Sequence, residues 1–401
     1  MSSPVSVLLR YPGAVARDMS AARDRAIRRR INIAWGLLYF NTMTFVAGTS
    51  VLPLPSRVGK GFAQAALPLA LLLLLTVNPK IKIRPNVFLC LVSLLVVDAV
   101  FTGIQVHRPG TLFRTVRLTE FVLALWLLTP WWGRRDMLLF KCHLRWTYVA
   151  LGSVFLGFVI APGHALAFDG RLQGVIWPMV ATQVAQYAAV AAGLTVVLWF
   201  ARHLSGRVAL AGIAMSVFIL LMAHTRTALI ALVAGIVVSG LSLFTSNARV
   251  RKAFAAGLVV VSAAVMTAAG FLTTWLARGE NTQGIATLTG RTNFWALVLD
   301  YPRNRFQELF GFGLSNASVN GLPIDSNWLA SYMQEGLFGV AVCAVILAFL
   351  FVAMLFHSRG VTRALALFIV AYVLLASFTE DAFTDVSTYM LHLTVAASLL
   401  A

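Results

Sequence analysis

Long apolar segments recur along the whole chain, separated by short polar stretches. Each holds at least sixteen residues with few charges, close to the ~20 residues that an α-helix needs to cross the hydrocarbon core of a bilayer. The pattern predicts transmembrane helices at residues 33–53, 61–78, 86–106, 115–132, 146–162, 177–200, 208–223, 227–245, 253–275, 328–356, 361–378 and 386–401. The predicted fold class is therefore all-α: a polytopic membrane protein with about 12 transmembrane helices.

The predicted spans divide the chain into four parts. A basic N-terminal arm covers residues 1–32, nine spans lie within 33–275, a polar loop covers 276–327, and three spans lie within 328–401. A loop of this length in an otherwise compact membrane protein is usually functional. We therefore expect the chemistry to involve the loop between spans nine and ten.

Composition and charge support the membrane class. Hydrophobic residues make up 59% of the chain and charged residues 11%, with a mean hydropathy of +0.83. A net charge of +18 on a soluble protein would suggest nucleic-acid binding, but most of these basic residues lie in short loops and form no RNA-binding motif. Of the 32 Lys and Arg residues, 21 fall on the side of the N-terminus. The positive-inside rule then predicts cytoplasmic termini and an extracytoplasmic loop at 276–327.

The three cysteines show no spacing typical of a metal site or a disulfide framework. Cys90, Cys142 and Cys343 are far apart and lie within or beside apolar segments. We interpret them as small buried residues, so the sequence predicts no metal site.

Arginines precede or open several helices on the predicted outer face. Arg171 lies in "FDGRLQG" before the sixth span, Arg226 opens the eighth, and Arg291 lies in "LTGR" with Trp295 one helical turn later. Asp325 lies in "PIDSN" at the entry to the tenth span. Taken singly, each arginine could be a snorkelling anchor and Trp295 an interfacial belt residue.

The order of these pieces resembles the O-antigen ligase and O-antigen polymerase superfamily of bacterial envelope glycosyltransferases. The resemblance covers about the C-terminal 60% of the chain, whereas the first five spans match only in number and hydropathy. The matching pieces are Arg171 with Gly174, "TRTAL" at 225–229, "TGR" at 289–291 with Trp295, "GFG" at 311–313, and "DSN" at 325–327 with "EGLFG" at 335–339.

The resemblance implies a location and a reaction. It implies a multi-pass protein of the bacterial cytoplasmic (inner) membrane that transfers a glycan from a polyprenyl diphosphate to an acceptor hydroxyl on the extracytoplasmic face. The implied partners are the lipid-linked oligosaccharide and a glycan or lipid acceptor, with no nucleotide sugar, metal or other cofactor. Ligases of the family carry a histidine where this chain has Asp325, and many polymerase-type members carry an acidic residue. The resemblance therefore favours a repeat-unit polymerase, with a ligase as the alternative.

The arginines suit the departure of a diphosphate. A leaving diphosphate needs positive charge, and guanidinium groups supply permanent charge in a planar fork that pairs with phosphate oxygens. We predict that Arg171, Arg226 and Arg291 surround one pocket and bind the diphosphate. Arg226 and Arg291 are also candidate catalytic residues.

Asp325 is the predicted base for the acceptor hydroxyl. Its alternative role is to cap the N-terminus of the tenth span, since Asp followed by Ser and Asn favours capping. His224 is a second candidate base or an interfacial bystander. Trp295 and Asn327 are candidate supporting residues.

Two acidic residues lie inside or at the edge of predicted spans. We expect Asp98 or Glu120 to pair with Arg114 or Arg117, because Arg117 and Glu120 share one helical face. The alternative is a proton relay, which would fit a twelve-span transporter or flippase. A non-catalytic membrane scaffold is a third reading, against which the arginines argue.

Overall fold

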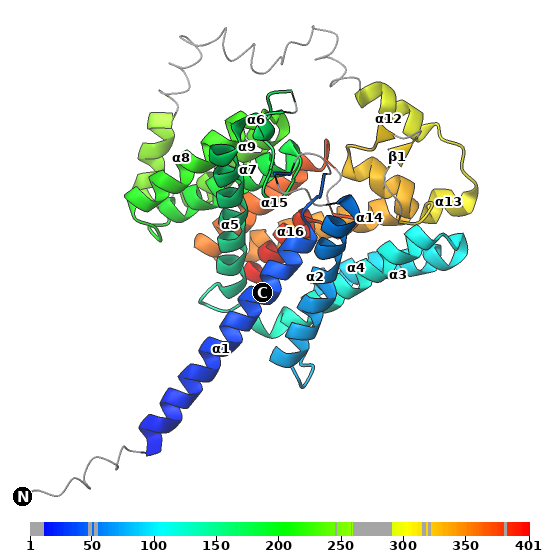
Figure 1. Ribbon diagram of the computed structural model, residues 1–401. Coiled ribbons are helices and arrows are strands. Elements are labelled where there is room, and N and C mark those ends of the chain that lie inside the picture. The colour runs from blue at the N-terminus through cyan, green and yellow to red at the C-terminus, as the bar shows by residue number, and fades with distance from the viewer. Residues whose placement is uncertain are drawn as a thin grey trace, which may run out of the picture.

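The computed structural model describes residues 12–46, 50–51, 55–167, 169–244, 247–257, 259, 291–314, 318–319, 322–380 and 383–401 (Figure 1). Its labelled elements are α1 (Pro12–Asn41), α2 (Ser56–Val77), α3 (Val87–Val106), α4 (Pro109–Leu128), η2 (Thr129–Trp131), α5 (Leu138–Ile160), α6 (Pro162–Ala165), α7 (Ala181–Phe200), α8 (Gly206–Met222), α9 (Arg226–Phe244), α12 (Arg291–Leu299), α13 (Arg305–Phe310), β1 (Ser318–Val319), β2 (Leu322–Pro323), α14 (Asn327–Phe356), α15 (Val361–Ala376) and α16 (Thr388–Leu400). Residues 248–257 are also helical.

Several helices identify the chain as a helical membrane protein, as its sequence predicts. Within the described residues, six helices are long and apolar enough to cross a membrane: α2, α3, α5, α7, α9 and α14. Three further apolar helices, α8, α15 and α16, are shorter. The predicted ninth span, 253–275, and the start of the predicted outer loop lie largely outside the described residues.

The first helix begins and ends earlier than the sequence predicted. The predicted arm, 1–32, and the predicted first span, 33–53, are joined, because α1 runs from Pro12 to Asn41. The first half of α1 is rich in Ala and Arg, which are strong helix formers. A helix of 30 residues is ~45 Å long and exceeds the ~30 Å core of a bilayer. Figure 1 shows α1 projecting from the body of the molecule.

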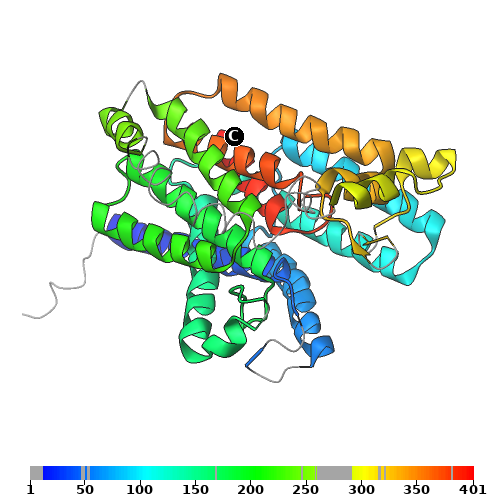
Figure 2. The same cartoon turned by 90° about the horizontal axis from the view of Figure 1, so that it is seen from above.

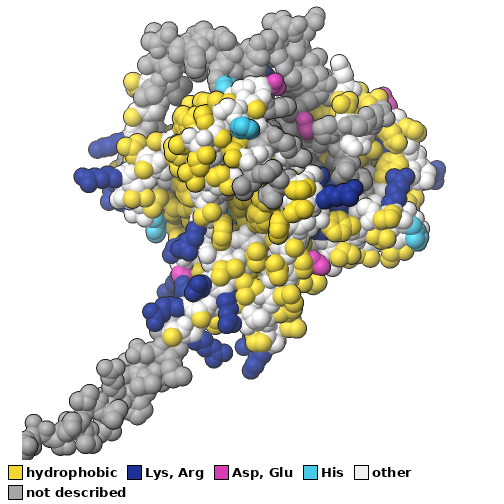
Figure 3. Space-filling model, viewed as in Figure 1, with side chains coloured by type: hydrophobic (Ala, Val, Ile, Leu, Met, Phe, Trp, Pro, Cys, Tyr) yellow, Lys and Arg dark blue, Asp and Glu magenta, His cyan; other side chains and the backbone are white. Residues whose placement is uncertain are grey.

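Consecutive long helices alternate between two ends of the molecule. At one end of the molecule α1 stops and six helices begin: α2, α4, α7, α9, α14 and α16. We call this end "the cavity end". There the hydroxyls of Thr42, after α1, and Thr388, at the start of α16, lie 2.9 Å apart. At the opposite end Gly133 N donates to Ser398 O over 3.0 Å. In Figure 3, Lys and Arg side chains gather where α1 leaves the body.

Helices α7, α15 and α16 form the centre of the bundle, and α9 packs against α15 and α7. Most side chains of α7, α15 and α16 are buried. Gly193 of α7 and Gly235 of α9 both lie against the ring of Phe368 on α15, where a Cβ would overlap it. Small residues of this kind let membrane helices approach closely, and close packing is the main attraction between helices in lipid.

The described part of the predicted outer loop is folded. It holds α12, α13 and an antiparallel hairpin in which Val319 pairs with Leu322. Val298, Ile324 and Ala330 form a small buried cluster with Val319, which joins the loop to α14. Figure 2 shows α12 and α13 grouped beside one end of α14.

Candidate functional site

A cavity of about 580 Å³ lies at the cavity end of the bundle, where α1 stops and α2, α4, α7 and α16 begin. Most of the residues that line it are polar, and they include three basic and two acidic side chains. The lining residues are Asn41, Thr42, Met43, Thr44, Phe45, Val46, Lys60, Arg114, Arg117, Val180, Thr182, Gln183, Gln186, Glu380, Asp385, Val386, Ser387, Thr388 and Tyr389. A polar, cationic cavity at one end of apolar helices is suited to an anionic head group.

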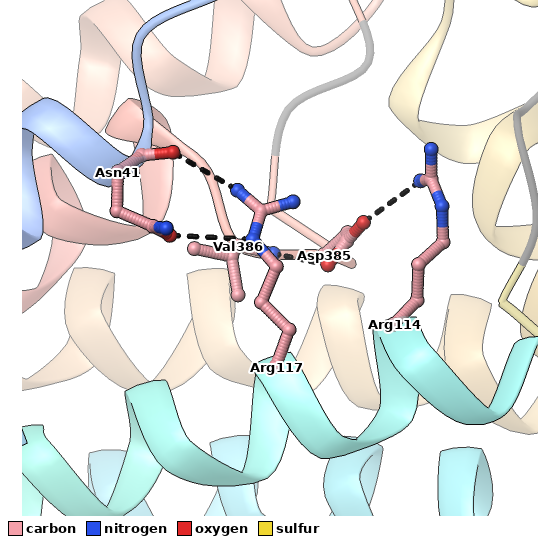
Figure 4. Close-up of polar contacts among 5 residues, drawn as sticks. All are labelled: Asn41, Arg114, Arg117, Asp385 and Val386. Carbon is pink, nitrogen blue, oxygen red and sulfur yellow. Dashed lines mark hydrogen bonds and ion pairs between the residues drawn. The ribbon is translucent and has the colours of Figure 1, made fainter. Parts of the chain in front are cut away.

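Two arginines of α4 line one side of the cavity (Figure 4). Pro109 occupies the first turn of α4, a position that favours helix initiation. Arg114 and Arg117 follow three residues apart in this helix and therefore share one face. Arg114 Nη1 pairs with Asp385 Oδ2 at 2.9 Å. Arg117 donates through Nε to Asn41 Oδ1 (3.2 Å) and through Nη2 to Asn41 O (3.1 Å). Arg117 thereby binds a carbonyl at the C-terminus of α1, where helix carbonyls lack partners.

The neutral side of the cavity is held by hydrogen bonds between α7 and the segment after α1. Gln183 Oε1 accepts from Thr44 N and from Thr44 Oγ1, each at 2.8 Å. Gln183 Nε2 donates to Thr42 O over 2.9 Å. Both ends of the Gln183 amide are therefore used within the wall, which fixes the wall before any ligand binds.

The 377–387 loop between α15 and α16 connects the cavity to three other helices. Asn327, the first residue of α14, donates from its backbone N to Ser377 O (2.9 Å) and accepts from Phe383 N at its side-chain Oδ1 (2.8 Å). Thr379 Oγ1 donates to Thr227 Oγ1 in the first turn of α9 (2.8 Å). The same loop carries the cavity residues Glu380 and Asp385, and Asp385 pairs with Arg114 of α4, so the loop contacts α4, α9 and α14.

Arg171 lies against the turn that precedes Arg226. Its Nε donates to Ala223 O (3.1 Å) and its Nη2 to Thr225 Oγ1 (3.2 Å). Burial lowers the pKa of the Arg171 guanidinium, and the nearby carboxylate of Glu380 acts in the opposite direction. Arg171 and Arg226, two of the predicted diphosphate ligands, thus lie in the same part of the fold, beside the 377–387 loop. Neither is among the residues that line the cavity.

The remaining predicted residues occupy different positions. The side chain of Arg291 lies outside the described residues, and Trp295 is half-buried on α12. The N-cap of α14 is Ser326, so the alternative role of Asp325 as the cap is wrong by one residue. Asn327 supports the 377–387 loop through the two bonds described above. His224 has a left-handed backbone (φ 48°), and its Nδ1 lies 3.1 Å from Met222 O.

The two glycine motifs meet in one backbone crossing. Gly311 (φ 74°) lies against the backbone of residues 334–335, and Gly336 (φ 64°) lies against that of residues 309–310. At both positions a Cβ would overlap the facing chain. Gly313 N donates to Gln334 O over 2.9 Å, and α14 is kinked at Gly336. "GFG" and "EGLFG" therefore hold α13 on α14.

The predicted pairing of Asp98 or Glu120 with the α4 arginines is wrong. Among the described residues the ion pairs are Arg28–Asp136, Arg114–Asp385 and Arg134–Asp136. Arg117 is directed to Asn41 because the end of α1 lies beside it, and Asp98 is buried in α3. The described residues also contain no group of three or more His, Cys, Asp or Glu that could hold a metal ion.

Four cavity residues lie outside the motifs of the sequence: Lys60, Gln186, Glu380 and Asp385. The available signal was the run of acidic residues in the short loop before the last span, because charges are rare so close to apolar segments. No protein-family model matches the chain, and no curated protein matches it.

Proposed function

We propose that the protein is a metal-independent glycosyltransferase of the bacterial cell envelope that transfers a polyprenyl-diphosphate-linked glycan to an acceptor hydroxyl. The observation that carries the proposal is the polar, cationic cavity at the ends of membrane helices. A lipid diphosphate needs positive charge at the membrane boundary with apolar surface beside it. The order of the outer-face motifs, which resembles the O-antigen ligase and polymerase superfamily, supports the reaction type.

In this proposal the chain crosses the cytoplasmic membrane twelve times and the cavity end is extracytoplasmic. The bias of basic residues toward the opposite end supports this orientation. The test is cysteine labelling in spheroplasts with an impermeant thiol reagent, in a Cys90→Ser background because Cys90 is exposed. Glu308→Cys on α13 should react and Ser205→Cys between α7 and α8 should not. The reverse pattern would contradict the orientation.

Lys60, Arg114 and Arg117 bind the diphosphate in this proposal, because they line the cavity. A guanidinium has five N–H donors, and the contacts of Arg117 with Asn41 use two of its nitrogens. The remaining donors can pair with phosphate oxygens as negative charge develops on the leaving group. Arg171 acts through the turn that it holds. Arg226 and Arg291 stay predicted contacts of the same head group.

We assign the base to Glu380, a carboxylate of the cavity lining. The acceptor hydroxyl transfers its proton to the Glu380 carboxylate while the acceptor oxygen forms a bond to the anomeric carbon of the glycan. The bond between that carbon and the diphosphate oxygen breaks, and its electron pair leaves on the diphosphate. Asp325 is the alternative base, because Asn327, two residues later, binds the loop that carries Glu380.

The favoured activity is a repeat-unit polymerase, with a ligase as the alternative. Asp325 supports the polymerase, because the family's ligases carry a histidine at the matching position. Deletion of the gene followed by electrophoresis of the surface glycans separates the two. A polymerase mutant should lose long chains and keep single repeat units. Accumulation of long lipid-linked chains without transfer would indicate a ligase, and an unchanged glycan profile would contradict both.

A further inference from the structure

Two histidines contact each other in the centre of the bundle. His143 of α5 and His392 of α16 are both fully buried, and His143 Nε2 lies 2.8 Å from His392 Nδ1. Trp35 Nε1 donates to His143 Nδ1 over 3.4 Å, and Gln186 Nε2 lies 3.3 Å from His392 Nε2. Gln186 also lines the cavity. A continuous chain of hydrogen bonds therefore joins Trp35 to the cavity wall, and the proposed reaction does not use it.

Both imidazole rings of this hydrogen-bond chain, His143 and His392, are neutral. A charge in a fully buried ring is costly unless an opposite charge pairs with it. The ion pairs among the described residues do not involve either histidine. Each ring therefore carries one N–H and one lone pair, so it donates at one nitrogen and accepts at the other.

Because each neutral ring has one donor and one acceptor, the direction of donation along the hydrogen-bond chain is fixed. The indole N–H of Trp35 can only donate, so His143 accepts at Nδ1 and carries its proton on Nε2. His143 then donates to His392 Nδ1, and His392 in turn carries its proton on Nε2. That proton needs an acceptor, so Gln186 turns its carbonyl oxygen to the ring, an orientation reached by a half-turn of the amide. If the amide nitrogen of Gln186 faced the ring instead, its N–H group and the Nε2–H group of His392 would point at each other with no acceptor between them.

The hydrogen-bond chain ends at Trp35 and cannot carry a proton across the membrane. An indole has no lone pair to accept a proton and does not release its own. This observation counts against a proton-coupled transporter that would use the histidine pair as its relay. The pair instead sets the orientation of the amide at the other end of the chain.

The polar neighbours of Gln186 use their protons within the wall. Thr42 Oγ1 donates to Tyr39 O at 2.7 Å, so the 2.9 Å contact between Thr42 and Thr388 must be a donation by Thr388. Thr388 then accepts from the hydroxyl of Tyr187 at 3.1 Å. These hydroxyl protons are directed into protein, whereas the half-turn of the Gln186 amide places its NH₂ group toward the cavity.

We propose that the histidine pair holds the Gln186 amide with its NH₂ group facing the cavity, which makes this part of the cavity a subsite for a neutral oxygen acceptor of the glycan. The subsite rests on the proposed function. A neutral donor suits a hydroxyl, ring or acetamido oxygen, whereas the diphosphate is bound by the cationic side chains Lys60, Arg114 and Arg117. Gln186 is thus a positioning residue for the sugar nearest the diphosphate.

The orientation is tested by ¹⁵N NMR of protein labelled at histidine and reconstituted in lipid. Nitrogen shifts separate protonated from unprotonated imidazole nitrogens, and spectra of His143→Gln and His392→Gln assign the two rings. Both rings should carry their proton on Nε2. Trp35→Phe should allow the opposite tautomers, while Trp126→Phe, which removes a comparable bond to Ser93 Oγ (3.0 Å), should not. An Nδ1–H tautomer at either ring of the wild type would overturn the proposal.

The subsite is tested by binding of two probes to protein in nanodiscs: farnesyl diphosphate and its ester with N-acetylglucosamine. The wild type should bind the sugar-bearing probe more tightly than farnesyl diphosphate. Gln186→Met should weaken binding of the sugar-bearing probe by about two- to tenfold, the worth of one hydrogen bond. Binding of the sugar-free probe should not change. Equal effects of Gln186→Met on both probes, or no gain from the sugar in the wild type, would overturn the subsite. Failure of the wild type to bind either probe would overturn the proposed function and the subsite with it, whatever the tautomers.

Discussion

The 377–387 loop has two unlike neighbourhoods. On one side α1, α2, α4 and α7 present charged and amide side chains to an open volume. On the other side, the starts of α9 and α14 direct polar groups to the loop itself: Thr227 accepts from Thr379, and Asn327 binds Ser377 and Phe383. Elsewhere Arg171 binds the 223–225 turn, and the "GFG" and "EGLFG" glycines hold two segments of the backbone together.

This difference separates recognisable motifs from ligand-facing residues. Most of the motifs that carry the family resemblance make contacts that build the fold. The cavity is lined mostly by residues from segments that have no motif at all, such as Lys60, Arg117 and Gln186. Substitutions on the cavity side should therefore change binding or transfer, and those at Arg171 and at the motif glycines should change stability.

The largest expected effect is at the proposed base. Glu380→Gln keeps the shape of the side chain and removes its basicity, so glycan transfer should fall by about a hundredfold or more. Protein level and affinity for farnesyl diphosphate should remain close to wild type. The matched variant is Asp325→Asn, assayed in the same membranes. Full activity of Glu380→Gln together with loss in Asp325→Asn would move the base to the motif side.

A smaller effect, on stability, is expected at the glycine crossing. Gly336→Ala forces a side chain into a left-handed φ and against the backbone of Leu309, which should cost at least about 2 kcal/mol. Thermal unfolding in detergent should begin at a clearly lower temperature. Gly61→Ala is the control, because a Cβ at Gly61 meets open space on α2. Equal unfolding temperatures for both variants would contradict the crossing.

The smallest effect is expected at Arg171. Arg171→Gln loses two hydrogen bonds to the 223–225 turn on a half-buried side chain, so stability should fall by about 1 kcal/mol. Thermal unfolding measures the loss. Since Arg171 does not line the cavity, the affinity for inorganic diphosphate should change little. A large loss of affinity without a loss of stability would make Arg171 a ligand after all.

The fold class was predictable because apolar length is a local property of the sequence. Span ends were less predictable: α1 continues through the arm, since Ala- and Arg-rich residues favour helix outside lipid as well as inside it. The direction of each helix followed from simple alternation. The structure of the predicted outer loop, with α12 and α13 packed on α14, depends on tertiary contacts that no local pattern contains.

The site was predictable only in part. The sequence pointed to the end of the helices at which the cavity lies and to segments that meet at the 377–387 loop, such as "TRTAL" and "DSN". It misassigned the α4 arginines, because pairing at i, i+3 considers one helix alone. Arg117 binds Asn41, 76 positions earlier, and Arg114 binds Asp385, 271 positions later. Contacts at such separations require the fold.

The proposed function requires the cationic side of the cavity to bind a diphosphate. Isothermal titration of purified protein with inorganic diphosphate tests it most directly, in the wild type, Arg117→Gln and Arg171→Gln. Arg117→Gln should weaken binding by about tenfold or more, the worth of a charge-assisted hydrogen bond, while Arg171→Gln should bind like the wild type. Unchanged affinity in Arg117→Gln, with binding lost in Arg171→Gln, would contradict it.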